Sequence, residues 1–168
     1  MSQRRGRTAL TRTELDSWRV FVETTEDLRA TLAGRLQSES GISAGDYRVL
    51  LELSEAPGRR LRSSHLADAI GWERSRLSHH LGRMEKRGLI RREAAAGDNR
   101  GAEAVLTNEG RDALRRSSVP HFHAIRELFL DALTPAQLAA ARDVAETLRD
   151  HLAALERPGV SRAALGPE

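Results

Sequence analysis

The chain has 168 residues, a formal net charge of +3 at pH 7, 39% hydrophobic residues and 30% charged residues. This length suits one domain with helical extensions, and the composition is typical of a folded, soluble protein. The lack of cysteine excludes disulfides, thiolate metal sites and thiol redox chemistry. No apolar run is long enough to span a bilayer, and the basic N-terminus lacks the apolar segment of a secretory signal, so we expect a cytoplasmic location.

The first predicted helix follows a basic N-terminal arm. We expect residues 1–10 to be flexible. Thr11 and Glu14 have the spacing of a capping box, in which each side chain accepts a hydrogen bond from the other residue's backbone N–H. Residues at helical spacing then predict an amphipathic helix that ends before Gly41. The predicted stripe consists of Trp18, Phe21, Val22, Thr25, Leu28, Leu32 and Leu36.

A second, shorter helix is expected to follow. Ser43 and Asp46 repeat the spacing of a capping box, and the apolar positions after them fit the buried face of a helix. The helix is expected to end before the Pro57-Gly58 pair, because proline and glycine interrupt regular helices. Leu61 then falls in a brief extended segment.

Two more short helices follow, separated by Gly71. Ser63 or Ser64 is expected to cap the first of them, and the second runs over about residues 74–87. Two helices across a tight turn are the pattern of a helix-turn-helix, whose second helix can enter the major groove of DNA. The inward positions of residues 74–87 are Leu77, Leu81 and Met84, and the candidate DNA-binding positions are Arg74, Ser75, Arg76, Ser78, His79 and Arg83.

A change of periodicity after these helices predicts a β-hairpin. The segments LIRREA and AEAVLT have the pattern of strands, joined by the turn AAGDNRG. Gly97 and Gly101 allow a tight tip with positive φ. We expect Arg100 to project from this tip into the DNA minor groove, whose negative potential attracts a guanidinium group. Asp98 is expected to pair with a nearby arginine and to hold the hairpin in shape.

Two helices complete the predicted chain. Thr107 is expected to cap a helix that is interrupted or kinked at Pro120, because proline lacks a backbone donor. Thr134, followed by Pro135, is expected to begin the last helix. Residues 156–168 contain several prolines and glycines, and we expect a disordered tail there. The apolar side of the last helix consists of Leu138, Ala141, Ala145, Leu148 and Leu152.

Positive charge is concentrated in the middle of the chain. Between Arg59 and Arg92, ten basic residues accompany three acidic ones. Such a cluster is typical of a protein that binds a polyanion, although a solvated helical surface has the same composition. Arg91 and Arg92 are expected either to contact phosphates or to keep the edge strand soluble. His80 is expected to pack against the neighbouring helix.

The run LADAIGWERSRLSHHLGRMEKRGLIRRE, followed by DNRGAEAVLTNEG, resembles the MarR family of transcriptional regulators. The wing signature of that family, Asp-x-Arg-Gly/Ala followed by Leu-Thr-x-x-Gly, is matched by Asp98, Arg100, Gly101, Leu106, Thr107 and Gly110.

The resemblance covers about residues 11–155 and implies a mainly α (α+β) fold with a two-strand wing. It implies a winged helix-turn-helix at residues 42–107 and dimerisation helices at residues 11–40 and 108–155. It also implies an obligate homodimer, which the wide apolar stripes of the terminal helices favour independently. A twofold dimer predicts a pseudo-palindromic operator with half-sites roughly 34 Å apart.

The same resemblance implies a ligand site, because members of the family commonly bind small anionic or phenolic molecules between the DNA-binding lobe and the dimer helices. Each candidate residue has an alternative interpretation as ordinary core. Neither a cofactor nor a metal site is expected, because His121 and His123 point in different directions on a helix. The candidate ligand-binding residues are Trp18, Phe21, Tyr47 and His65.

We therefore expect a homodimeric, sequence-specific DNA-binding transcriptional regulator, a repressor released by a small anionic or aromatic ligand. An enzyme is not expected, because the sequence has no phosphate-binding glycine loop, nucleophile elbow or serine-histidine-aspartate motif. Two alternatives stay open. One is a winged-helix module that binds protein or ligand without specific DNA binding, and the other is an architectural protein that binds any duplex.

Overall fold

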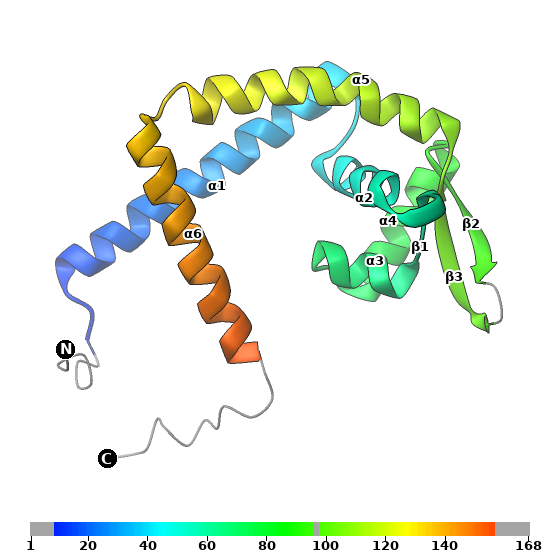
Figure 1. Cartoon of the computed structure of the whole chain (residues 1–168), viewed down its shortest axis with the longest axis horizontal. Helices are drawn as coiled ribbons and strands as arrows, with labels where there is room; N and C mark the ends of the chain where they lie inside the picture. Colours follow the sequence, from blue (N-terminus) through cyan, green and yellow to red (C-terminus); the bar gives the residue numbers. More distant parts are fainter. Residues whose placement is uncertain (1–8, 96–97, 157–168) are drawn as a thin grey trace, which may run out of the picture. The chain divides into compact units, whose positions relative to one another are not determined.

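The computed structural model describes residues 9–95 and 98–156. The chain divides into two compact units, Met1–Ala124 and Ile125–Glu168. Most of the predicted N-terminal arm (residues 1–10) and of the predicted tail (residues 156–168) therefore lies outside the described residues. The elements shown in Figure 1 are α1 (Arg12–Ser40), α2 (Ala44–Glu55), η1 (Pro57–Arg59), β1 (Arg60–Arg62), α3 (Ser63–Ile70), α4 (Arg74–Lys86), β2 (Ile90–Ala95), β3 (Asp98–Leu106), α5 (Asn108–Ile125), η2 (Arg126–Leu130) and α6 (Pro135–Glu156).

The first two helices begin and end as predicted. The N–H of Glu14 donates to Thr11 Oγ1 at 3.2 Å, and the N–H of Asp46 donates to Ser43 Oγ at 3.1 Å, so both capping boxes are formed. Helix α1 ends at Gly41, whose φ of +67° is the left-handed conformation that glycine adopts without steric cost. The mainly helical fold with one small antiparallel sheet is confirmed.

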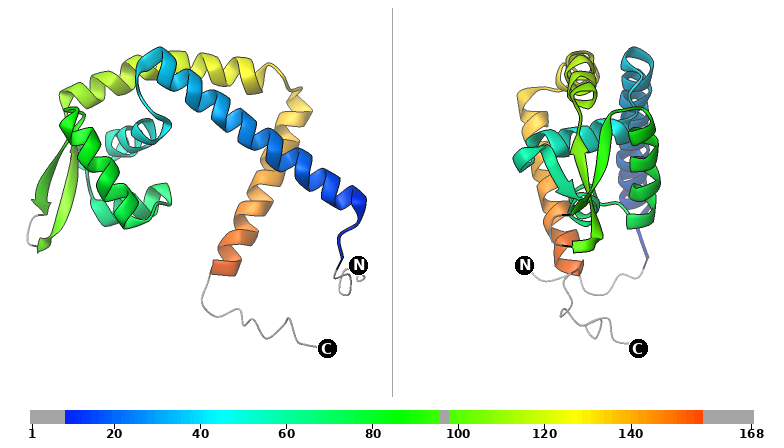
Figure 2. Two further views of the ribbon diagram at one scale, coloured as in Figure 1. Left: turned by 180° about the vertical axis from the view of Figure 1, so that it is seen from behind. Right: turned by 90° about the vertical axis from the view of Figure 1, so that its right-hand side faces the viewer.

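The sheet has three strands in the order β1-β3-β2, all antiparallel. The predicted two-strand wing is therefore joined by β1, in which Leu61 pairs with Ala104. The β2–β3 hairpin extends away from the start of α5, as the views from the front, the back and the side show (Figures 1 and 2). Strand β1, by pairing with β3, fixes the base of this hairpin to the helical body.

The core of unit Met1–Ala124 lies between helices α2, α3 and α4 and the sheet. Apolar residues at helical spacing on each of these helices are buried, as are residues of β2 and β3. The largest fully buried side chains include Leu50, Leu53, Leu66, Ile70, Leu77, Leu81, Met84 and Ile90.

The start of α3 differs from the prediction. Neither Ser63 nor Ser64 caps the helix, because both are already helical residues and Arg62 occupies the capping position, where its side chain makes no capping hydrogen bond to the helix. The hydroxyl of Ser63 instead donates to the carbonyl of Ala102 in β3 at 2.9 Å. Pairing of β1 with β3 brings this acceptor close, so the serine side chain links α3 to the hairpin.

Helix α5 starts as predicted but continues further. The N–H of Gly110 donates to Thr107 Oγ1 at 3.0 Å, which caps the helix, and the same hydroxyl donates to the carbonyl of Gly88 at 2.7 Å. Of the predicted interruption or kink at Pro120, the interruption is wrong, since α5 runs through Pro120 to Ile125, and the kink stays a prediction. Proline removes only one backbone donor, and here the helix tolerates that loss.

Unit Ile125–Glu168 contains η2 and α6. Helix α6 begins as predicted, because the N–H of Gln137 donates to Thr134 Oγ1 at 3.3 Å and Gln137 Oε1 accepts from the N–H of Thr134 at 2.9 Å. Its apolar side chains, including Leu148 and Leu152, are exposed in the single chain. No helix in the described ranges is both long enough and apolar enough to cross a membrane.

Candidate nucleic-acid interface

Helix α4 has one buried face and one polar face. Leu77, Leu81 and Met84 are buried, as predicted, and His80 is buried beside them with 8% exposure. The helical repeat of 3.6 residues then directs the remaining positions outward. The six predicted DNA-contact positions, Arg74, Ser75, Arg76, Ser78, His79 and Arg83, are all exposed.

Trp72, which precedes α4, supports one of these arginines. The guanidinium carbon of Arg76 lies 4.4 Å from the centre of the Trp72 ring, which is the arrangement of a cation–π contact. Trp72 in turn packs edge-on against the ring of His80, with ring centres 5.1 Å apart. The indole therefore restricts Arg76 on the outer face of α4. No role was predicted for Trp72 from the sequence, although its position four residues before Arg76 matches one helical turn.

A polar cluster around the buried carboxylate of Asp46 lies behind α4. The carboxylate of Asp46, at the start of α2, accepts a hydrogen bond from Arg87 Nη1 at 2.6 Å, and Oδ1 lies 3.0 Å from His80 Nε2. The latter contact is close enough for electrostatic attraction but lacks the direction of a straight hydrogen bond. Arg87 also donates to the carbonyl of Gly41 at 2.9 Å. The end of α4 is thus fixed to the junction of α1 and α2.

These contacts determine the protonation state of Asp46. Burial by itself raises the pKa of this carboxyl group, but the close contact with His80 and the hydrogen bonds from Arg87 and Ser43 outweigh burial and hold the pKa well below its usual range. Asp46 is therefore charged at neutral pH. The sequence predicted only its capping role, since its partners lie 34 and 41 positions further along the chain.

Ion pairs occupy several arginines around the base of the hairpin. Arg60 Nη1 lies 3.4 Å from Glu93 Oε2, and Arg91 pairs with the same glutamate. Arg92 donates through both its backbone N–H and its side chain to Glu85, at 2.9 and 2.8 Å. The structure shows a role for Arg91 and Arg92 that was not among the two expected. Arg92 links β2 to α4 through Glu85, and Arg91 pairs with Glu93 on the same strand.

The hairpin turn is shorter than predicted. Residues 98–101 were expected in the turn, but their backbone belongs to β3, and Ala95 pairs with Asp98. Ala94 pairs with Ala102, so the three residues from Asn99 to Gly101 have no partner on β2 and form an irregularity in the ladder. The predicted side-chain roles of Asp98 and Arg100 and the predicted turn residue Gly97 lie outside what the structure describes.

The four candidate ligand-binding residues do not share one hollow. Tyr47 lines a hollow between α1, α2 and α5, whereas Phe21 lines a shallower one along α1 and His65 lies in a third beside η1. Trp18 is 61% exposed on α1. Their role in ligand binding stays a prediction, and the structure singles out the position of Tyr47.

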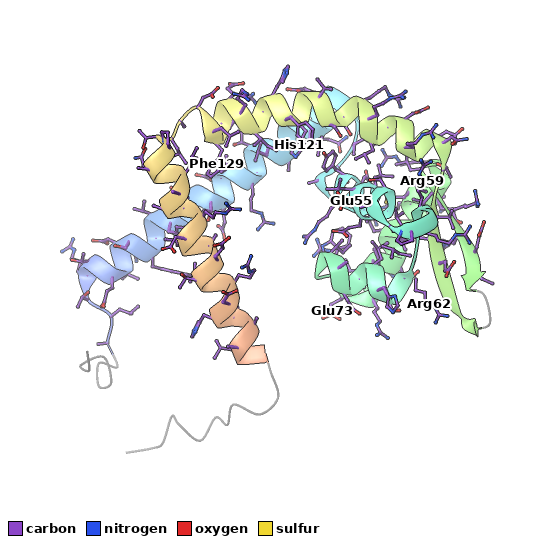
Figure 3. The ribbon with its side chains drawn as sticks, in the orientation of Figure 1. Glu55, Arg59, Arg62, Glu73, His121 and Phe129 are labelled. Atoms are coloured by element: carbon purple, nitrogen blue, oxygen red, sulfur yellow. The ribbon has the colours of Figure 1, made fainter. Side chains whose placement is uncertain are left out.

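The hollow around Tyr47 has a volume of about 540 Å³ and mixed chemistry. Its apolar wall comes from α1 and α2, and two arginines, Arg29 and Arg48, also line it. His121, which α5 carries (Figure 3), lies with its ring centre 4.8 Å from that of Tyr47. Burial lowers the pKa of His121, and its Nδ1 has no hydrogen-bond partner among the described residues. From the sequence, His121 was a candidate only for metal binding, and its place beside Tyr47 was not predicted.

Metal binding finds no support in the described ranges, which contain no group of three or more histidine, cysteine, aspartate or glutamate side chains placed to hold an ion.

Comparison with known proteins identifies relatives of the whole arrangement. Residues 40–101 match the model of the MarR family. AbsC, a MarR family transcriptional regulator from Streptomyces coelicolor, is 37% identical, with 88% of this chain and 99% of AbsC covered and a TM-score of 0.81. Sco3205 from the same organism, a MarR family regulator solved in complex with DNA, is 36% identical over 94% of this chain and 96% of its own, with a TM-score of 0.82.

A curated relative extends the comparison to another organism. The transcriptional regulator HosA of Escherichia coli is 34% identical over 88 residues, which are 52% of this chain and 63% of HosA. The match therefore spans less than two thirds of the length of that relative. Each of these relatives is named as a transcriptional regulator, in agreement with the expectation that the chain is not an enzyme.

Proposed function

Because the chain belongs to the MarR family of transcriptional regulators, we propose that it is a homodimeric repressor that binds a specific operator and is released by a small ligand. The observation that carries the proposal is the polar, arginine-rich outer face of α4, opposite an inner face that is apolar except for His80. An α-helix fits the major groove of DNA, and arginine, serine and histidine side chains can bond base edges or phosphates.

In this proposal the α4 helix lies in the major groove and the hairpin reaches an adjacent minor groove. Arg76 is the strongest candidate for a base contact, because Trp72 restricts its guanidinium before DNA arrives. Arg100 is the candidate for the minor groove, where narrow A·T-rich segments attract arginine. Two copies related by a twofold axis place two α4 helices on half-sites roughly 34 Å apart. Support comes from Sco3205, a relative whose structure contains DNA.

The proposed ligand site is the hollow lined by Tyr47 and His121. Its apolar wall suits an aromatic ring, and Arg29 and Arg48 offer positive charge to a carboxylate. The ligand acts by stabilising a dimer in which the two α4 helices are wrongly spaced for the operator. Such a ligand must bind that state more tightly than the DNA-bound state, because equal affinity for both states shifts nothing.

The proposal is tested by fluorescence anisotropy on a duplex from the region upstream of the protein's own gene. A scrambled duplex of the same length and composition is titrated alongside, over a series of salt concentrations. We expect the upstream duplex to bind at least about a thousandfold more tightly and binding to weaken steeply with salt. Equal affinity for both duplexes would favour the architectural alternative, and no binding to either would favour a protein- or ligand-binding module.

Variants then locate the contact surface. Arg76→Ala is expected to lower affinity for the upstream duplex about tenfold, and Arg100→Ala to lower it by a similar factor on duplexes with a narrow A·T-rich minor groove. Arg115→Ala is the matched control, because it removes an exposed arginine of α5 outside α4 and the hairpin. Unchanged binding by the Arg76→Ala, Arg100→Ala double variant would contradict this mode of DNA binding.

The ligand proposal needs its own test. Benzoate and phenol are titrated into the preformed protein–DNA complex, since they share a ring and differ in the carboxylate. We expect benzoate to release DNA at lower concentration than phenol, and Arg48→Ala to remove that preference. Equal release in wild type and Arg48→Ala would contradict the assignment of this hollow.

A further inference from the structure

Two buried residues lie directly behind one of the proposed DNA contacts. Arg83 is exposed on α4, yet its Nη2 donates a hydrogen bond to Nδ1 of His80, 2.9 Å away. On the other side of the same ring, Nε2 faces Oδ1 of Asp46 at 3.0 Å. His80 is thus placed between a buried carboxylate and a surface guanidinium, with contacts to both.

The chemistry of these groups fixes the state of the histidine ring. A guanidinium group has only donors, so Nδ1 of His80 must be the acceptor and carries no proton. A neutral imidazole then carries its single proton on Nε2, the atom that faces the charged carboxylate of Asp46. The Asp46 charge favours this tautomer, and the tautomer provides the acceptor that holds Arg83.

The packing around the ring leaves it little freedom. Trp72 contacts the ring edge-on at 5.1 Å. A Cβ at Gly45 would lie 3.0 Å from His80 Cε1 and 2.9 Å from Trp72 Cη2. The backbone of α2 therefore packs directly against both rings and leaves no room for a side chain at residue 45. Asp46 itself is anchored by Arg87 and by the capping box with Ser43. The imidazole is therefore held on three sides, and its acceptor position is fixed relative to α4.

We propose that His80 is a positioning residue for DNA binding, which holds Arg83 in the orientation that meets DNA and is itself set by Asp46. The proposal rests on the proposed function, because Arg83 must contact DNA for its orientation to matter. A long arginine side chain loses rotamer freedom when it binds a phosphate or a base, and an arginine held in place beforehand loses less. His80 thereby contributes to affinity without touching DNA.

Two substitutions separate positioning from packing. His80→Asn keeps an amide oxygen on Cγ, near the position of Nδ1, and therefore keeps an acceptor for Arg83. His80→Gln places its amide one carbon further out, where it meets Asp46 but offers no acceptor at the Nδ1 position. We expect Arg83→Ala and His80→Gln each to weaken binding to the upstream duplex about fivefold to tenfold, and His80→Asn to weaken it less than about twofold. Thermal unfolding of each variant shows whether the changes follow stability instead.

A double-mutant cycle gives the coupling directly. In the His80→Gln background, Arg83→Ala is expected to cost less than about twofold further, because the orientation is already lost. Arg74→Ala is the matched control, since Arg74 is an exposed arginine of the same helix with no contact to His80. Its effect on affinity should be the same in both backgrounds.

A spectroscopic readout does not depend on DNA. Two-bond ¹H–¹⁵N correlation spectra of the free protein report which ring nitrogen carries the proton, and we expect the Nε2-protonated tautomer for His80. The Nδ1-protonated tautomer, or additive effects of His80→Gln and Arg83→Ala in a wild type that binds its operator, would overturn the positioning role. Failure of the wild type to bind any duplex would contradict the proposed function instead, and the two failures are thus distinguishable.

Discussion

At the scale of single residues, Gly110 is the glycine in the described part of the chain where an added side chain would meet its neighbours at the shortest distance. A Cβ at this position would lie 2.0 Å from the backbone carbonyl oxygen of Leu89 and 2.9 Å from Leu106 Cδ1. The start of α5 can therefore approach the start of β2 only if residue 110 has no side chain. This contact gives a physical reason for the glycine that ends the Leu-Thr-x-x-Gly motif.

Gly110→Ala is accordingly expected to destabilise the fold by about 3 kcal/mol, because a backbone carbonyl cannot move aside as a flexible side chain does. Urea unfolding followed by circular dichroism measures the loss. The matched control is Gly82→Ala in α4, where a Cβ would meet no atom within 4 Å. That change should stabilise the protein by about 0.5–1 kcal/mol, since alanine loses less backbone entropy in a helix. Equal effects at the two glycines would contradict the argument.

Asp46 carries a buried charge with partners from two later parts of the chain. Its folded-state pKa lies below its value in the unfolded chain, so its charge stabilises the protein at any pH above about 4 and this stabilisation is lost as pH falls further. Asp46→Asn is expected to cost about 2 kcal/mol at pH 7, an amount limited by the partial exposure of Arg87.

The measurement is the unfolding free energy of wild type and Asp46→Asn at about pH 7, 5 and 3. The difference between them should stay constant from pH 7 to 5 and shrink at pH 3, because the Asp46 carboxyl group of the unfolded wild-type chain takes up a proton there whereas that of the folded chain stays charged. Asp68→Asn, on the exposed side of α3, should change stability by less than about 0.5 kcal/mol throughout. An undiminished difference at pH 3 would mean that the charge of Asp46 is not what stabilises the junction.

The same residue shows how far sequence reasoning reaches at this scale. The exposure of Arg76 and His79 follows from helical periodicity, and the structure agrees with it. The capping role of Asp46 follows from its spacing to Ser43. Its contacts with His80 and Arg87 depend on tertiary packing of α2 against α4, which no local pattern contains.

At the scale of elements, the ends of α1 and α2 were predictable because capping is local in sequence. The start of α3 was not predictable in this way, because it depends on the pairing of β1 with β3. That pairing places the Ser63 hydroxyl where it donates to the carbonyl of Ala102 instead of capping the helix. The short hairpin turn was missed for a related reason. Strand pairing continues to Asp98 across an irregularity, although glycine at residue 101 favours a turn locally.

The first turn of α2 connects the proposed ligand site with the proposed DNA-contact surface within its unit. Ala44, Tyr47 and Arg48 line the hollow proposed for the ligand, and Asp46 in the same turn contacts His80 and Arg87 of the α4 segment. A ligand that displaces this turn would therefore displace the support of Arg83. This gives the proposed release from DNA a physical route through directly contacting residues.

The cap of α1 allows a prediction at the element scale. Thr11→Ala removes the side chain that accepts from the N–H of Glu14, and it should destabilise the protein by about 1 kcal/mol. Thr13→Ala is the matched control, because Thr13 lies two residues later on the exposed surface of the same helix and does not cap it. Its cost should be below about 0.5 kcal/mol. Urea unfolding of both variants measures the difference, and equal costs would show that the cap contributes nothing.

At the scale of the whole molecule, the single chain leaves much apolar surface in water. On α1 the side chain of Trp18 is 61% exposed, on α5 that of Phe122 is 59% exposed, and on α6 that of Leu152 is 58% exposed. Monomeric proteins seldom leave large aromatic and aliphatic residues exposed along three helices. The sequence predicted the stripes from their periodicity, but periodicity alone does not say what covers them, because a second internal layer would produce the same pattern.

The proposed homodimer makes a prediction at this scale. Light scattering after size exclusion should give about 37 kDa, twice the 18.6 kDa of the chain, and the unfolding midpoint should rise with protein concentration, since association stabilises the folded state by mass action. Leu148→Glu with Leu152→Glu places two charges on the apolar side of α6 and should yield a monomer of about 19 kDa or an unfolded chain.

Ala139→Glu is the matched control, because the helical repeat puts residue 139 on the opposite side of α6 from that stripe. It should leave the mass and the concentration dependence unchanged. A wild-type mass of one chain, independent of concentration, would instead require a different protein to cover these faces, and the twofold operator would lose its basis.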